Sequence, residues 1–300
     1  MKIRNTLAAV IAACCLLTVG CSSKEADESS NNSSSAVADE NSSAGDNSSI
    51  VVSSEIGKSG DGNLNFELKA GDTIAEFNIE GYGTIKAKLF PEIAPKGVDN
   101  FIKLAEQGYY NGKTIHRVMA DFMLQGGSLN GDGTGGEAAD GGDFGVEANY
   151  NARHFYGALC YANAAGRNTT QFYIVNNKKP QDFTQLPPDN IRASADSYKP
   201  YRDAYAEGSF EYQYYDNMVT YYSNLADMIE NALDGTEDKY KAEGGTPTLD
   251  GGYTVFGQVY EGLDVIDAIS ACEVEARGNE LSKPVDTITI TSVTISEYAG

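Results

Sequence analysis

Residues 114–128 read Thr-Ile-His-Arg-Val-Met-Ala-Asp-Phe-Met-Leu-Gln-Gly-Gly-Ser, and the rest of this 300-residue chain is organised around them. The apolar run at the start predicts a buried strand, and Arg117 stands inside it. A bulky apolar cluster begins at Phe122, and Gln125 precedes two glycines. Glycine alone adopts positive φ without strain, so the chain can turn sharply there. The stretch therefore places a guanidinium, an amide and an apolar pocket close together.

The stretch resembles the signature of the cyclophilin family of peptidyl-prolyl isomerases, in which Phe-His-Arg is followed by Phe-Met-x-Gln-Gly-Gly-Asp. Here residues 115–117 read Ile-His-Arg, and residues 122–128 read Phe-Met-Leu-Gln-Gly-Gly-Ser. The resemblance implies that Arg117, Gln125 and Phe122 are catalytic and that Met123 binds the substrate.

The first twenty residues have the order of a secretion signal. Lys2 and Arg4 precede an uncharged apolar run, residues 7–19, that is too short to span a bilayer comfortably. Residues 17–21, Leu-Thr-Val-Gly-Cys, resemble a bacterial lipobox, which implies lipidation of Cys21. We therefore expect a lipoprotein signal peptide over residues 1–20 and an extracytoplasmic protein anchored to the cell membrane. Ordinary signal cleavage, with a secreted product, is the alternative.

Residues 21–63 are rich in Ser, Asn and acidic side chains and almost free of large apolar ones. Such a segment cannot bury enough surface to offset the entropy of ordering, so we expect a disordered tether. About forty residues of this kind have an r.m.s. reach of roughly 35 Å.

The composition excludes nucleic acid as a partner, because 22 Lys and Arg stand against 43 Asp and Glu, a formal net charge of −21. The glycines at 131, 133 and 136 have the spacing of a dinucleotide-binding loop, but the acidic residues among them would repel a pyrophosphate, and no helix pattern follows. We expect no cofactor and no metal. Of the five cysteines, Cys160 and Cys272 are the two that lie in the part expected to fold. Two free thiols are the favoured interpretation, and a disulfide stays open.

Residues 73–79 and 84–90 predict a β-hairpin. In the second strand apolar residues alternate with lysines, so we expect Lys88 on the solvent side. Pro95 then opens a helix that stops at Gly108.

Residues 157–163 and 168–174 resemble two further cyclophilin segments, Gly-x-Leu-Ser-Met-Ala-Asn and Asn-Thr-x-x-Ser-Gln-Phe-Phe-Ile. In this chain they read Gly-Ala-Leu-Cys-Tyr-Ala-Asn and Asn-Thr-Thr-Gln-Phe-Tyr-Ile. Tyr173 brings a hydroxyl to a position where the family has phenylalanine. The resemblance implies that substrate is bound by Ala162, Asn163, Gln171 and Tyr173.

Residues 249–259, Leu-Asp-Gly-Gly-Tyr-Thr-Val-Phe-Gly-Gln-Val, resemble the family's Leu-Asp-Gly-x-His-x-Val-Phe-Gly-x-Val. The resemblance makes Leu249 a pocket residue and puts Tyr253 in place of the family's histidine. A helix with Leu263 on its inner face and a final strand over residues 287–295 should follow.

The resemblance covers about residues 74–185 and 244–295 and implies a closed antiparallel β-barrel of eight strands capped by two helices, and we assign residues 64–181 and 244–297 to this domain. Residues 182–243 interrupt it as a tyrosine-rich insertion, and a helical stripe running from Met218 to Leu233 favours burial against the barrel over a client-binding surface. Both ends of the insertion coincide with loop signals, so we expect a separable module.

The resemblance implies a peptidyl-prolyl cis-trans isomerase that acts on proline-containing segments of exported proteins. Amide resonance sets a rotation barrier of about 18–20 kcal/mol. A donor aimed at the nitrogen of the twisted amide binds that state best, and Arg117 would be the donor. No nucleophile is needed, so we interpret His116 and His154 as structural, and we expect a monomer. The alternative is a non-catalytic cyclophilin-like lipoprotein that binds peptides or acts as a chaperone.

Overall fold

The computed structural model describes residues 55–300. The expected signal peptide, Cys21 and most of the expected tether lie outside these residues. Residues 55–63, which we assigned to the tether, already contact the folded part: the Gly57 N–H donates to the Ala148 carbonyl over 2.9 Å. Asn63 is completely buried. The contacts of the folded part therefore begin before Asn63.

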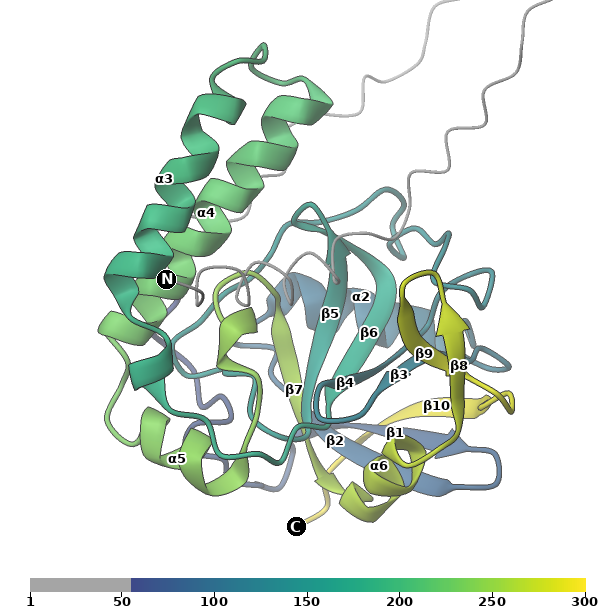
Figure 1. The fold of residues 1–300 in the computed structure, drawn as a ribbon. Helices are drawn as coiled ribbons and strands as arrows, with labels where there is room; N and C mark the ends of the chain where they lie inside the picture. Colours follow the sequence, from purple (N-terminus) through teal and green to yellow (C-terminus); the bar gives the residue numbers. More distant parts are fainter. Residues whose placement is uncertain (1–54) are drawn as a thin grey trace, which may run out of the picture. The chain divides into compact units, whose positions relative to one another are not determined.

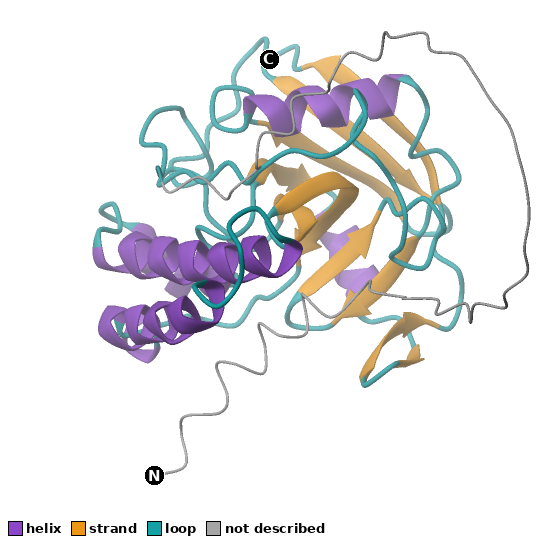
Figure 2. Ribbon diagram, turned by 90° about the horizontal axis from the view of Figure 1, so that it is seen from above, coloured by secondary structure: helices purple, strands orange, loops and turns teal. Residues whose placement is uncertain are grey.

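Eight strands form one curled antiparallel sheet, as predicted, in the order β10-β1-β2-β7-β5-β6-β4-β3 (Figures 1 and 2). The strands are β1 (Thr73–Ile79), β2 (Gly83–Leu89), β3 (Ile115–Met119), β4 (Met123–Gly126), β5 (Ala158–Ala164), β6 (Arg167–Val175), β7 (Val255–Glu261) and β10 (Ile290–Glu297).

The two outer strands of this order, β3 and β10, share no ladder within residues 55–300. Three backbone hydrogen bonds nevertheless join the segments at these edges, and one of them runs from the Gly112 N–H to the Ile290 carbonyl over 2.8 Å. The Ile115 N–H donates to the Ile288 carbonyl over 2.9 Å, and the Ile290 N–H donates to the Lys113 carbonyl over 2.8 Å. What is observed is thus a curled sheet whose edges approach each other at one place.

The alternation in β2 predicts its buried face correctly but not Lys88. Ile85, Ala87 and Leu89 are buried, and so is Lys88, at 4% exposure. The Lys88 ammonium pairs with the Asp72 carboxylate at 2.8 Å. A buried ammonium requires such a partner, and the partner lies outside the alternating pattern.

Aromatic side chains fill the inside of the curled sheet. The ring of Phe101, from helix α2 (Pro95–Glu106), lies 5.7 Å from that of Phe77 and 5.2 Å from that of Phe256. Helix α2 has no cap of its own at its first turn, and the Glu147 carboxylate accepts from the N–H groups of Lys96 and Gly97 at 3.1 and 2.9 Å. This carboxylate satisfies free donors at the positive end of the helix.

The insertion is helical. It contains α3 (Pro188–Arg202), α4 (Phe210–Glu230) and α5 (Thr236–Glu243), and α3 and α4 lie side by side, projecting from one side of the sheet (Figures 1 and 2). The predicted stripe is buried from Met218 to Ile229, whereas Leu233 lies beyond the end of α4 and is 37% exposed.

The chain after β7 contains one element that we did not predict. Helix α6 (Leu263–Ser270) forms as expected, and Ile266 and Ile269 are buried as predicted, but Leu263 is 36% exposed and Val265 is buried instead. A small hairpin of β8 (Val274–Arg277) and β9 (Glu280–Pro284) follows, and β9 lies against β3.

Both remaining cysteines, Cys160 and Cys272, are free thiols, which settles the open question of a disulfide in favour of our first interpretation. Within residues 55–300, no helix has the length and apolar character needed to cross a membrane.

Candidate active site

Arg117 lies in the middle of β3, directly opposite Gln125 in β4. Opposite residues of neighbouring strands project from the same face of a sheet, so the two side chains meet. The Arg117 Nη1 group donates to Gln125 Oε1 over 3.2 Å. The guanidinium and the amide that the signature stretch predicts as catalytic are therefore in contact.

The row of polar side chains continues into β6. Gln125 Nε2 donates to Gln171 Oε1 over 3.1 Å, and Gln171 Nε2 donates to the Gly133 carbonyl over 3.0 Å. Tyr173 lies opposite Gln125 in the ladder between β4 and β6, two residues from Gln171. Residues two apart in a strand share a face, so Tyr173 joins this row.

Glu280, in β9, is a partner of Arg117 that the sequence did not reveal. Arg117 Nε donates to Glu280 Oε1 over 2.7 Å, and Nη2 donates to Oε2 over 2.8 Å. Burial tends to raise the pKa of Glu280, but hydrogen bonds from Arg117 and Ser282 outweigh it and hold the pKa below its ordinary value. The Gly278-Asn279 turn could have predicted the hairpin, but not its position against β3.

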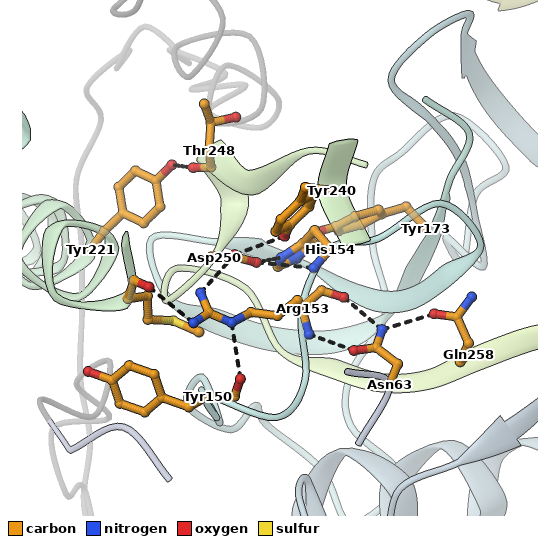
Figure 3. A network of polar contacts seen from close by, with 11 residues as sticks. Asn63, Tyr150, Arg153, His154, Tyr173, Tyr221, Tyr240, Thr248, Asp250 and Gln258 are labelled. Atoms are coloured by element: carbon orange, nitrogen blue, oxygen red, sulfur yellow. Dashed lines mark hydrogen bonds and ion pairs between the residues drawn. The ribbon is translucent and has the colours of Figure 1, made fainter. Parts of the chain in front are cut away.

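The Tyr173 hydroxyl is paired with His154 (Figure 3). It lies 2.9 Å from His154 Nε2, while His154 Nδ1 lies 2.8 Å from Asp250 Oδ1. Since Nδ1 must carry a proton to bond a carboxylate, Nδ1 donates to Asp250, and the Tyr173 hydroxyl forms its hydrogen bond with Nε2 on the other side of the ring. The Tyr253 ring packs edge-on against Tyr173, with ring centres 6.1 Å apart. The polar end of Tyr173 is therefore satisfied within the protein.

Asp250 is the centre of a fully buried network (Figure 3). Its Oδ2 accepts from Arg153 Nη1 over 3.1 Å and from the Tyr240 hydroxyl over 2.8 Å. Burial tends to raise the pKa of Asp250, but Arg153 and His154 outweigh it and hold the pKa below the ordinary value. Tyr240 belongs to α5, and Arg153 also donates to the Met228 carbonyl in α4 over 3.0 Å. The insertion thus bonds directly to the segment beside Leu249.

The remaining expected site residues lie around these groups. Asn163 Nδ2 donates to the Gly252 carbonyl over 3.0 Å, next to Tyr253. Leu249 is buried at the end of the short 3-10 helix η2 (Pro247–Leu249). Phe122 is partly exposed in the turn between β3 and β4. Met123 is buried in β4, with its sulfur 3.9 Å from Arg117 Nη1, and Ala162 is partly exposed in β5.

The sequence that folds into this curled sheet, with its arginine and two glutamines at one face, matches a known protein family. The family described as "Cyclophilin type peptidyl-prolyl cis-trans isomerase/CLD" matches residues 74–186 and 215–295. The chain belongs to this family and is a peptidyl-prolyl cis-trans isomerase. The match resumes at residue 215, inside α4, so the family region extends into the part that we assigned to the insertion.

Several relatives and solved structures are similar to the chain. A protein of Staphylococcus aureus (strain USA300) named as a peptidyl-prolyl cis-trans isomerase is 34% identical over 237 residues, covering 78% of this chain and 97% of the relative. One from Staphylococcus haemolyticus (strain JCSC1435) is 36% identical over 216 residues, covering 72% and 87%. A cyclophilin type isomerase of Cryptosporidium parvum aligns with a TM-score of 0.49 and 20% identity, over 76% of this chain and 99% of that one.

Proposed function

We propose that this isomerase works by donating a hydrogen bond from Arg117 to the nitrogen of the twisted prolyl amide. The nitrogen regains its lone pair only when the amide is twisted, so the bond stabilises the transition state more than either planar state. A charge-assisted hydrogen bond contributes about 1.5–3 kcal/mol, which corresponds to about ten- to a hundredfold in rate. The observation that supports this role is the contact of Arg117 with Gln125, which orients the guanidinium.

The rest of the acceleration is assigned to holding the substrate. In our proposal Phe122, Met123, Tyr173 and Leu249 receive the proline ring, with Tyr253 packed behind Tyr173. Gln125 and Asn163 hold the flanking backbone, with Ala162 and Gln171 beside them. Fixing a reactant in a near-reactive geometry lowers the barrier without any covalent step. The buried positions of Met123 and Leu249 support an apolar pocket.

A change in the reactive arginine tests the mechanism in a protease-coupled assay on a Xaa-Pro peptide. Arg117→Lys keeps the charge but lacks the planar fork, so kcat/KM should fall nearly as far as when the side chain is removed. Phe122→Ala should weaken binding and turnover together, because it empties part of the pocket. Wild-type kcat/KM in Arg117→Lys would show that the planar guanidinium is not needed.

We also propose that the protein is lipid-anchored through Cys21 and acts on exported proteins. The basic, apolar and Gly-Cys order of the N-terminus supports this location. Cys21→Ala should move the protein from the membrane fraction to the medium or leave an uncleaved precursor. A mature N-terminus at another residue, without lipid, would contradict the anchor.

We further propose that the curled sheet functions as a closed barrel. The three backbone hydrogen bonds that link residues 112–115 to residues 288–290 support closure. If the sheet is closed, hydrogen exchange of the Ile115 and Ile290 amides should be as slow as that of amides within the β1–β2 ladder. Rapid exchange at both positions would indicate an open edge.

A further inference from the structure

The β8–β9 hairpin is bonded to the rest of the protein on both sides of its turn, to strand β3 on one side and to the loop after β4 on the other. Glu280, the first residue of β9, bonds to Arg117, and Arg277, the last residue of β8, donates to the Asp132 carbonyl. The turn between them is Gly278-Asn279, with Gly278 at φ +61°. The hairpin therefore brings a carboxylate to the guanidinium proposed to act in catalysis.

The geometry of the pair is suited to orientation. Glu280 bonds the edge of the guanidinium formed by Nε and Nη2, at 2.7 and 2.8 Å, and two parallel bonds to a planar fork fix its plane as well as its position. The Arg117 contact with Gln125 is longer, at 3.2 Å. The Ser282 hydroxyl donates to Glu280 Oε1 over 2.6 Å, so the carboxylate itself is held.

We propose that Glu280 is a positioning residue for the isomerase reaction, holding the Nε–Nη2 edge of Arg117 so that Nη1 stays on the side of Gln125. This inference rests on the proposed role of Arg117. A free arginine side chain samples many rotamers, and a preset orientation removes part of the entropy loss from the catalytic step. The lowered pKa of Glu280 keeps the carboxylate charged at neutral pH, so the pair persists where the enzyme is assayed.

Two other roles for Glu280 make different predictions. A carboxylate that only fastened the hairpin would affect stability and leave kcat of the folded enzyme unchanged. A carboxylate that competed with the substrate for Arg117 would slow the enzyme, and its removal would raise kcat/KM. A positioning residue instead lowers kcat when removed, with little change in KM.

The test compares Glu280→Gln and Glu280→Ala with the matched control Glu275→Gln. Glu275 lies in β8 of the same hairpin, with its side chain 53% exposed, and pairs with Lys283 at 2.6 Å. Glu280→Gln keeps the shape of the side chain and one acceptor but loses the charge. Charge-assisted hydrogen bonds are about twice as strong as neutral ones, so kcat should fall about three- to tenfold. Glu280→Ala removes both acceptors and should lower kcat further. Glu275→Gln should retain wild-type kcat. The melting temperature of each variant is measured as well, so that kcat is compared only between folded proteins.

Arg117→Ala, measured in parallel, separates failure of this inference from failure of the proposed function. In that background Glu280→Gln should cause no further loss of kcat, because the two residues act as one unit. If Arg117→Ala is impaired but Glu280→Gln is as active as wild type or faster, or falls no more than Glu275→Gln, the positioning role is wrong and the role of Arg117 stands. If Arg117→Ala keeps full activity, the proposed mechanism fails, and the positioning role fails with it.

Discussion

Two arginine–carboxylate pairs in this molecule have similar chemistry and different surroundings. Arg153 and Asp250 both have completely buried side chains, whereas the Arg117 side chain is 3% exposed and that of Glu280 is 19% exposed. The first pair connects the insertion to the interior, and the second connects a small hairpin to the outer strand β3. If Arg117 is the catalytic donor, as we propose, one kind of contact serves the fold in one place and orients a reactive group in the other.

The Arg153–Asp250 pair is built to be satisfied completely. Each Asp250 oxygen accepts two hydrogen bonds, and every Arg153 nitrogen of the side chain donates one. A buried charge is tolerated only under such conditions, because each unpaired charge carries a large desolvation penalty. The partners come from residues far apart in the chain, so the network also selects one arrangement of these segments.

The largest loss of unfolding free energy should come from breaking the buried Arg153–Asp250 pair. Asp250→Ala leaves the Arg153 charge without its carboxylate, and removing one partner of a buried pair costs about 3–5 kcal/mol of unfolding free energy. Chemical denaturation would measure this loss. Glu280→Gln, at the more exposed pair, should change the unfolding free energy far less, so equal losses in the two variants would remove the distinction between the pairs.

A smaller loss of stability should appear at acidic pH, and its cause is His116, which lies near Arg117. Burial, together with the nearby positive charges of Arg277 and Arg117, lowers the pKa of His116 to about 4, against a smaller opposing effect of Asp132. The unfolded chain binds a proton near pH 6.5 and the folded protein only near pH 4, so stability should fall as pH falls through this window, by up to about 3 kcal/mol.

Denaturation of the wild type and of His116→Gln at pH 7, 5.5 and 4.5 measures this contribution. The variant cannot gain the proton, so its stability should vary less with pH over this range. Parallel curves for the two proteins would mean that other groups cause the acid sensitivity.

The smallest loss of unfolding free energy should come from removing the one hydrogen bond that Tyr240 of the insertion donates to the buried network. Tyr240→Phe removes one of the two donors to Asp250 Oδ2 and should cost about 0.5–1.5 kcal/mol, with kcat/KM unchanged. Tyr201→Phe, at a tyrosine of α3 that is 59% exposed, is the control and should be neutral. No loss in Tyr240→Phe would show that this hydrogen bond does not help to hold the insertion in place.

Local pattern predicted much of the fold and part of the site. The alternation in β2 and the proline at the start of α2 mark those elements because their cause lies within a few residues, and the signature stretch contains both Arg117 and Gln125. Glu280 lies 163 residues from Arg117 in the chain, and nothing near either residue indicates their contact.

The same limit explains the other errors of the sequence interpretation. Lys88 alternates with apolar residues as an exposed lysine would, and its partners Asp72 and the Glu67 carbonyl, both before β1, explain its burial. Asp250 follows Leu249, which the resemblance over residues 249–259 makes a pocket residue. Its hydrogen-bond partners come from the segment before β5 and from α5. Pairings between distant segments require the fold to be known.

The most direct test of the proposed catalytic role is kcat/KM of Arg117→Ala on a Xaa-Pro peptide, together with its melting temperature. We predict a ten- to hundredfold loss, an effect of about 1.4–2.8 kcal/mol on the transition state, with little change in KM and a folded protein. A folded Arg117→Ala variant with wild-type kcat/KM would contradict the mechanism, because the twisted amide would then be stabilised without this guanidinium.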